Sequence, residues 1–471
     1  MSPEPSFIMK SIDLDPEIVE KDENHHCNLN DSEAVAQRLS KCDDLPSSSN
    51  LHRLDPSSNA DVPFYCAIIP AILSGGSDYF GLGSIGPLLP YYVASMNASD
   101  QWVGYVTSAQ FVGVLIGGIA LGRAADLYGL KKVITISLCA DAIFFTLTGF
   151  CNSPTLLAAC RLVAGFFTPL VPSISWVINT SDINPTATKN TVGFNMGVWA
   201  FCMSACYMLG SVVGGALGPD KWIELNIISG AVALFACVYM LFMKEPTRAE
   251  KGLKPDGLNV IMKQPEFVAL LANNLMLGII FTSRLVAVSL FMKNDLDATS
   301  LQVSIYLVVS SGIHGIINFS VLPWTIKRFQ GPWQAMAGAT VLAAISSICF
   351  CFKFAYSTIA IFCALNVMSS LILPIIMTSA NILCGNYAAK YTTNARTVVL
   401  GLSRFFFNIG QIVGPILSVA LIQWSNIAQF SGITFIAILT WFVWLYFDRC
   451  AKPYIKAAQI EMTELVSTDS L

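Results

Sequence analysis

Five ionisable residues lie inside long apolar stretches of the sequence. They are Asp78, Asp141, Arg284, His314 and Arg404. A charged side chain at the centre of a bilayer costs at least ~2.5 kcal/mol unless it is paired or hydrated. Acids and bases in such positions carry protons or bind charged solutes, so each of the five is a candidate functional group.

Asp78 is the foremost candidate for moving a proton. It lies about halfway along the first apolar segment and follows Gly75 and Gly76, which can loosen the helix beside it. Asp141, in the middle of the third segment, is the second proton candidate, with a structural hydrogen-bonding role as its alternative. For Asp78 the alternative is a structural pair with Arg284.

Arg284, in the seventh segment, is a candidate for binding the carboxylate of a substrate. A cation in a cavity favours an anionic substrate, whereas Asp78 favours a cationic one, and the sequence leaves both open. His314 is also a substrate-binding candidate, with a packing role and a proton relay as the alternatives. Tyr79 and Trp176 are aromatic candidates for substrate contact, with ordinary helix packing as the alternative.

The segments that hold these residues are long enough to cross a membrane. Hydrophobic residues make up 54% of the chain and charged residues only 12%, about half the charged share of a soluble domain. The run between Asp100 and Arg123 contains 22 uncharged residues, and about 20 cross the hydrocarbon layer. We predict twelve spans at 64–93, 101–121, 132–151, 155–178, 191–217, 222–243, 267–292, 301–323, 333–353, 356–385, 397–422 and 426–447.

The predicted fold is an all-α membrane protein of twelve transmembrane helices arranged as two pseudo-symmetric six-helix bundles. Residues 1–62 form an acidic tail that we expect to be disordered and cytoplasmic, without a cleaved signal peptide. The first bundle covers 63–243 and the second covers 266–449. A Lys-rich cytoplasmic loop at 244–265 joins them, and 450–471 form a cytoplasmic tail.

Basic residues are concentrated in the loops on one side of the predicted spans. That side holds 16 Lys and Arg and the other holds three. The positive-inside rule therefore predicts a multi-pass protein with both termini in the cytoplasm. Asn97 falls in the first outer loop as a glycosylation sequon whose use stays open, as does the choice between the plasma membrane and an internal membrane.

The loop between the second and third predicted spans carries the most specific motif of the chain. It consists of Gly122, Arg123, Asp126, Gly129 and Lys131. This pattern resembles the loop signature of the major facilitator superfamily, and the resemblance covers roughly residues 63–450. In that family the Asp is thought to hold the two halves together at the N-terminal end of the eleventh span, where the helix dipole stabilises a carboxylate.

Two further elements resemble patterns of the same family. Arg161 begins an Arg-x-x-x-Gly element in the fourth span and is a third proton-coupling candidate, with snorkelling to the interface as the alternative. Small residues in the fifth and eleventh spans resemble the element that marks antiporters, and close helix packing explains them equally well. They are Gly210, Gly214, Gly218, Gly414 and Pro415.

The pattern is closest to the twelve-span drug/proton antiporters of the family. It implies a secondary active transporter that moves a small organic solute by alternating access, with proton-coupled export as the favoured mode. The alternative is a facilitator or proton symporter for an organic anion or a sugar-like nutrient. The expected partners are a small-molecule substrate, protons and the lipid bilayer, and the expected state is a monomer.

Other classes of function fit the sequence poorly. A net charge of −3 gives no basic field for nucleic acid, and no phosphate-binding loop points to ATP. With four His in the chain, no cluster predicts a metal site, a cofactor or an enzyme. The 14 Cys lie mostly in apolar runs, where thiols pack as small hydrophobes.

Overall fold

The computed structural model describes residues 64–183, 191–245, 262, 264–328, 332–391, 396–425, 428–440 and 442–443. Regular structure in these ranges is helical and contains no strand. Among the described residues, eight helices are long and apolar enough to cross a membrane. The predicted all-α membrane fold is therefore confirmed. The predicted tails at 1–62 and 450–471, and most of the loop at 244–265, lie outside the described residues.

The first group of helices follows the order of predicted spans one to six. Spans one and four are each built from two helices. The elements are α2 (Phe64–Ile85), α3 (Leu89–Ser95), α4 (Gln101–Tyr128), α5 (Leu130–Thr148), α6 (Pro154–Phe166), α7 (Leu170–Ile183), α8 (Thr191–Leu217), η4 (Pro219–Lys221) and α9 (Trp222–Phe242).

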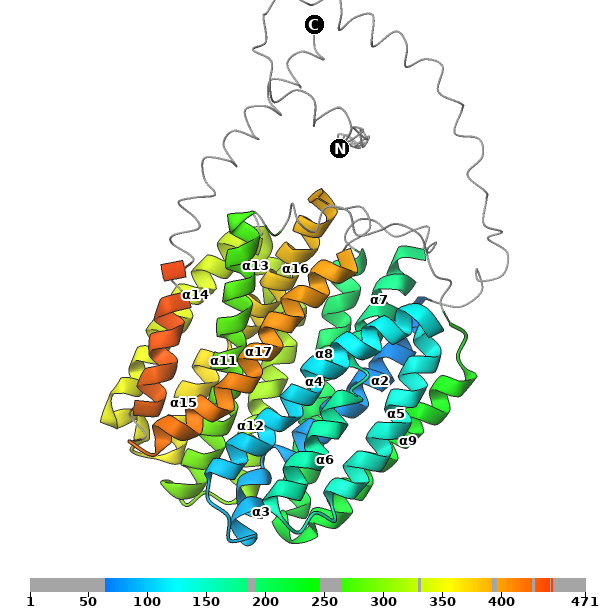
Figure 1. Ribbon diagram of the computed structural model, residues 1–471. Coiled ribbons are helices and arrows are strands. Elements are labelled where there is room, and N and C mark those ends of the chain that lie inside the picture. The colour runs from blue at the N-terminus through cyan, green and yellow to red at the C-terminus, as the bar shows by residue number, and fades with distance from the viewer. Residues whose placement is uncertain are drawn as a thin grey trace, which may run out of the picture. The chain divides into compact units, whose positions relative to one another are not determined.

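The second group follows the order of predicted spans seven to twelve (Figure 1). An apolar helix at Ala428–Thr440 follows its last labelled element. The elements are α11 (Pro265–Asn294), α12 (Ser300–Ile316), the π-helical turn η5 (Ile317–Val321), α13 (Leu322–Arg328), α14 (Pro332–Ile348), η6 (Cys349–Cys351), η7 (Lys353–Tyr356), α15 (Ile359–Ser370), α16 (Leu373–Tyr391) and α17 (Arg396–Ile422).

Prolines interrupt spans one and four, which we predicted as continuous helices, and span ten also breaks, between Ser370 and Leu373 beside Pro374. The helix of span one stops at Ile85 and restarts at Leu89, on either side of Pro87. Span four breaks between Phe166 and Leu170, on either side of Pro169. Proline lacks a backbone N–H and disfavours the helical conformation of the residue before it, which accounts for the breaks in spans one and four.

Glycines allow helices of the same group to pack backbone against backbone. A Cβ added to Gly210 of α8 would lie 2.1 Å from the carbonyl oxygen of Phe80 in α2. In the second group, a Cβ on Gly410 of α17 would lie 2.1 Å from the carbonyl oxygen of Leu275 in α11. The α2–α8 and α11–α17 crossings are therefore built in the same way, by residues without side chains.

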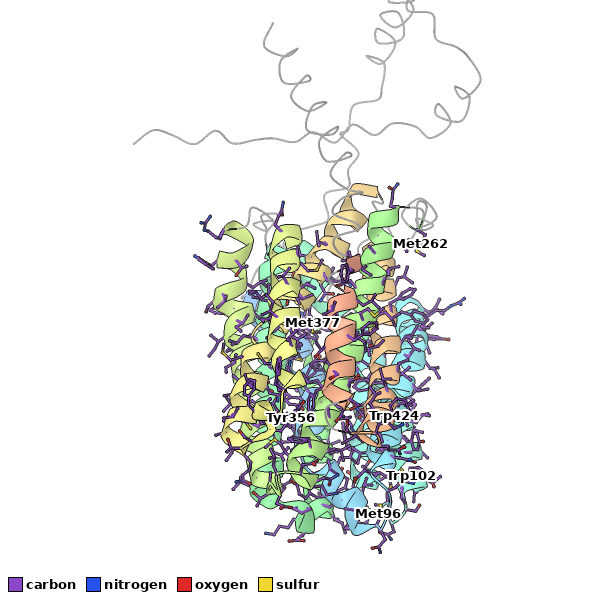
Figure 2. All side chains as sticks on the ribbon, turned by 90° about the vertical axis from the view of Figure 1, so that its left-hand side faces the viewer. Met96, Trp102, Met262, Tyr356, Met377 and Trp424 are labelled. Atoms are coloured by element: carbon purple, nitrogen blue, oxygen red, sulfur yellow. The ribbon has the colours of Figure 1, made fainter. Side chains whose placement is uncertain are left out.

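The two groups meet through α4 with α17 and α8 with α12. Further contacts lie at the end of the bundle that carries the loop at 96–100, which we call the Asn97 end. Figure 2 shows Met96 and Trp102 toward this end and Met262 at the opposite one. The carboxylate of Asp100 lies 3.6 Å from the Lys293 ammonium and accepts a 2.7 Å hydrogen bond from Asn294.

Two more hydrogen bonds join the groups on the same side. The Tyr91 hydroxyl donates to the carbonyl oxygen of Ala298 at 2.5 Å, and Ser108 donates to that of Ile412 at 2.8 Å. These contacts join the groups at the Asn97 end, and α8 also packs against α12 and η5 further along the bundle, where the ring centres of Phe201 and Phe319 lie 5.9 Å apart.

Candidate functional site

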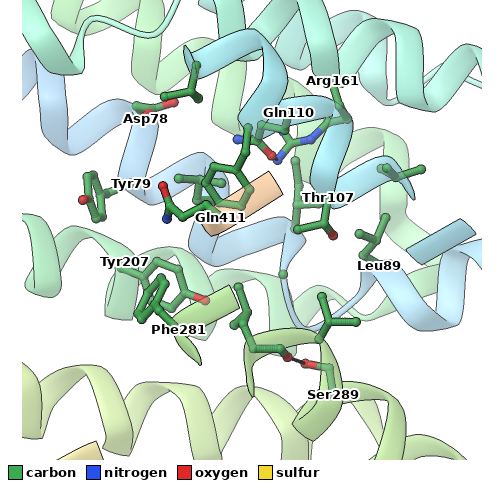
Figure 3. Close-up of a pocket in the computed structure, with 18 of the residues that line it drawn as sticks. Asp78, Tyr79, Leu89, Thr107, Gln110, Arg161, Tyr207, Phe281, Ser289 and Gln411 are labelled. Carbon is green, nitrogen blue, oxygen red and sulfur yellow. Dashed lines mark hydrogen bonds between the residues drawn. The ribbon is translucent and has the colours of Figure 1, made fainter. Parts of the chain in front are cut away.

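A cavity of about 130 Å³ lies between the two groups of helices. Residues of α2, α3, α4, α6, α7 and α8 line one side, and residues of α11, α16 and α17 line the other. Most of its wall is apolar. Figure 3 shows Asp78, Gln110 and Arg161 toward one side of the cavity and Phe281 of α11 toward the opposite side.

Asp78 lies in α2, at the wall of this cavity, and its side chain is only 5% exposed. Its carboxylate accepts a 2.9 Å hydrogen bond from the hydroxyl of Thr168. Thr168 lies in the break between α6 and α7, so Pro169 helps to place this donor. Arg161 and Arg404 are close enough to act on Asp78 electrostatically.

Arg161 and Asp141 complete a buried group of charges with Asp78. Arg161 of α6 is 3% exposed, donates from Nη2 to the side-chain oxygen of Gln110, and lies 5.6 Å from the centre of the Phe145 ring. Asp141 of α5 is fully buried and interacts electrostatically with both Asp78 and Arg161. The structure therefore brings together the three residues that the sequence proposed for proton coupling.

Arg404 enters this cavity from the second group of helices. Its guanidinium lies 4.8 Å from the centre of the Phe407 ring, and its Nε has no hydrogen-bond partner. The sequence showed Arg404 as an ionisable residue inside an apolar run but did not distinguish a cavity residue from an interfacial one. The structure places it in the cavity wall.

A second pocket, of about 120 Å³, adjoins the first and contains Arg284 and His314. Polar side chains of α8 and α12 line it as well. Both pockets share the walls formed by Tyr79, Tyr207, Phe281 and Leu285. Tyr79 thus lines both pockets, and its contact with a substrate stays a prediction.

The side chain of Arg284 is held by Asn366 of α15. Arg284 Nε donates to the Asn366 amide oxygen at 3.1 Å, and Nη2 donates to the same oxygen at 2.9 Å and to the backbone carbonyl oxygen at 2.6 Å. The structural pair between Arg284 and Asp78, considered from the sequence, is not formed. Asp78 is hydrogen-bonded to Thr168 instead.

Trp176 does not reach either pocket. Its side chain is 2% exposed and belongs to the hydrophobic core of the first group, among residues of α4, α5, α8 and α9. Its position is explained by packing, which was the alternative from the sequence. Gln110, Thr168 and Asn366 were not identified from the sequence, because nothing distinguishes them there from other uncharged polar residues in the spans.

The loop signature lies at the end of the bundle opposite Asn97. Gly129 has a φ of 99°, a left-handed conformation that favours glycine, and ends α4. The backbone N–H of Leu130 donates to Glu245 at 2.6 Å, and the Lys131 ammonium donates to the carbonyl oxygen of Leu241 at 2.8 Å. These bonds tie the loop to the end of α9, in the same group of helices.

The remaining residues of the family-like patterns have simpler surroundings. Gly122 lies in α4, Arg123 is exposed there, and the side chain of Asp126 is outside the described part of the structure. Gly218 ends α8 with a φ of 74°. Gly214 packs against Ser84, and Gly414, next to Pro415, packs against Thr282. Over the described residues, no group of three His, Cys, Asp or Glu side chains is placed to hold a metal ion.

Comparison with known proteins identifies the class. The family model described as Major Facilitator Superfamily matches residues 71–389. The chain therefore belongs to the Major Facilitator Superfamily, as its loop motif suggested, and is a membrane transporter.

Curated relatives in this family carry several functional names. Multidrug resistance protein 1 of Bacillus subtilis (strain 168) is 24% identical over 350 residues, which are 72% of this chain and 85% of the relative. The Gentisate transporter of Corynebacterium glutamicum is 29% identical over 147 residues, or 31% of this chain and 30% of the relative.

Solved structures share the fold at low sequence identity. The nucleoside transporter NupG has a TM-score of 0.61 at 16% identity, with 81% of this chain and 98% of that chain covered. The human organic anion transporter MFSD10 has a TM-score of 0.61 at 15% identity, with 82% of this chain and 100% of that chain covered.

Proposed function

We propose that this transporter couples the movement of protons to the export of a small organic solute by alternating access. The cavity between the two groups of helices is the translocation site, and Asp78 is the residue that exchanges the proton. The observation that carries this proposal is a buried group of charges, in which Asp78 and Arg161 line that cavity and Asp141 lies buried behind its wall.

The charges of this group suit a proton carrier. Two carboxylates, Asp78 and Asp141, interact with a single cation of the same group of helices, Arg161. With both acids ionised, these three side chains carry one net negative charge, and binding one proton removes it. Arg404 faces Asp78 from the second group, so movement of one group against the other changes how strongly the ionised form of Asp78 is stabilised.

The contacts at the Asn97 end support alternating access. The pair between Asp100 and Lys293 joins the two groups near the surface of the bundle. Exposed ion pairs contribute only about 0–1 kcal/mol, so such a contact can break and re-form in each transport cycle. The drug-resistance names of several relatives favour export as the direction.

The test is solute flux in proteoliposomes with and without an imposed pH gradient, using a mixed library of metabolites and drugs. We expect the gradient to drive solute movement in the wild type, and Asp78→Asn to abolish this dependence because an amide cannot exchange a proton. Asp220→Asn, which changes an exposed acid in η4, is the matched control. A solute flux that is the same with and without the gradient, and the same in the wild type and Asp78→Asn, would refute proton coupling.

A further inference from the structure

We infer that the transported solute is an organic anion with an apolar body, and that its acidic group docks on Arg284. This inference rests on the proposed transport through the central cavity. It follows from the balance of charge in the two pockets, from the neutral partners of Arg284, and from the apolar wall that both pockets share.

The two pockets contain more positive than negative charge. Among the described residues that line them, three are Arg and one is an ionisable acid: Arg161, Arg284, Arg404 and Asp78. Asp141, buried behind the wall, adds a second acid. Even with both acids ionised, one positive charge remains, and protonating either acid increases the excess.

The uncompensated charge is that of Arg284. Arg161 faces both acids, and Arg404 faces Asp78. By contrast, Arg284 bonds to the amide and carbonyl oxygens of Asn366, which are neutral. No described carboxylate makes an ion pair with it. A guanidinium inside a membrane protein is costly without an anion or water, so an acidic ligand would be strongly favoured at this position.

The surroundings of Arg284 suit an acidic group. Asn366 fixes the orientation of the guanidinium through Nε and Nη2. Tyr306, another neutral side chain, also hydrogen-bonds to Arg284. The same pocket is lined by the hydroxyl-bearing side chains of Ser310 and Ser311, which are able to donate hydrogen bonds to anionic oxygens. A carboxylate or sulfonate would therefore be bound by charge and by hydrogen bonds together.

The apolar body of the solute would lie along the wall that the two pockets share. Tyr79, Tyr207, Phe281 and Leu285 line both pockets, so a molecule docked on Arg284 must pass against them to extend toward Asp78. The pockets measure about 120 and 130 Å³. A cavity of about 150 Å³ holds one benzene molecule, so the size of the body is on the order of one ring or one short alkyl chain per pocket.

The test measures ligand-induced thermal stabilisation of the purified full-length protein. Two matched sets of probes differ only in charge: benzoate, benzamide and benzylamine, and hexanoate, hexanamide and hexylamine. Because a ligand that binds the folded state raises Tm, the acids should stabilise the wild type, and the amides and amines should do so less. Stabilisation by the neutral or cationic members that equals or exceeds that of the acids would overturn the inference.

Substitutions then test the docking residue. Arg284→Gln should weaken binding of the acids at least tenfold, because a charge-assisted hydrogen bond is lost. Arg284→Lys keeps the positive charge and should retain part of the affinity, which distinguishes loss of docking from loss of folding. Arg328→Gln, at an exposed position of α13, should bind the acids as the wild type does. Unchanged binding in both Arg284 variants would refute docking at this residue.

The two proposals fail separately. If the acids bind through Arg284 but their transport does not depend on a pH gradient, the proposed proton coupling is refuted and the anion site is supported. If coupling is found with cationic solutes only, the anion site fails and the coupling stands.

Discussion

At the scale of single residues, the proposed proton coupling depends on the contacts of Asp78. Its carboxylate has a hydrogen bond from Thr168, a residue placed by the break at Pro169. Asp78 and Asp141 were predictable because ionisable residues are rare in apolar runs, and Arg161 because it begins an Arg-x-x-x-Gly element that resembles a family pattern. Thr168 was not, since the partner of a buried acid is decided by tertiary packing rather than by local pattern.

Thr168→Val should therefore impair coupling. The change keeps the shape of the side chain but removes the hydroxyl, and hydrogen bonds to charged groups contribute about 1.5–3 kcal/mol. We expect gradient-driven transport to fall about tenfold, measured as the initial rate in proteoliposomes. Thr168→Ser keeps the hydroxyl and should restore most of the rate. Equal rates in the Val variant and the wild type would show that this bond does not matter for coupling.

At the scale of the helices, the sequence predicted the positions of the spans well, because these depend on the length of apolar runs. It predicted the breaks within the spans poorly. Long uncharged runs located the helices of both groups. The prolines at positions 87 and 169 mark the interruptions in the sequence itself, although both spans were predicted as continuous helices. The partners of the small-residue elements could not be predicted, because a glycine stripe shows that a helix packs closely but not which helix it meets.

Gly410→Ala should disrupt the α11–α17 crossing. The added Cβ would lie 2.1 Å from a backbone carbonyl oxygen, so the two helices must move apart. We expect a lower Tm by several degrees and at least a tenfold loss of transport. Gly401→Ala in the same helix meets no atom within 4 Å and is the matched control. If the Gly410 and Gly401 variants had the same Tm, the close crossing would not contribute to stability.

At the scale of the whole molecule, transport requires the two groups of helices to move against each other. The structure shows them joined at the Asn97 end, where Asp100 of one group contacts Lys293 and Asn294 of the other. The sequence predicted two groups of helices but not the contacts that join them, because these contacts involve residues almost 200 positions apart, such as Asp100 and Asn294.

Joining this end covalently should stop the cycle. In the double variant Asp100→Cys, Asn294→Cys, a short, reducible thiol cross-linker should block transport, and a reductant should restore it. The chain has 14 Cys of its own, so the wild type and each single variant are treated with the same reagent as controls. Full transport by the cross-linked double variant would show that this end need not open.

The most direct test of the central claim is to measure proton flux itself. A solute gradient is imposed across proteoliposomes without an initial pH difference, and an internal pH dye reports proton movement for the wild type and for Asp78→Asn. We predict a solute-dependent pH change in the wild type that is absent from the variant. Solute movement without any pH change in the wild type would contradict the account.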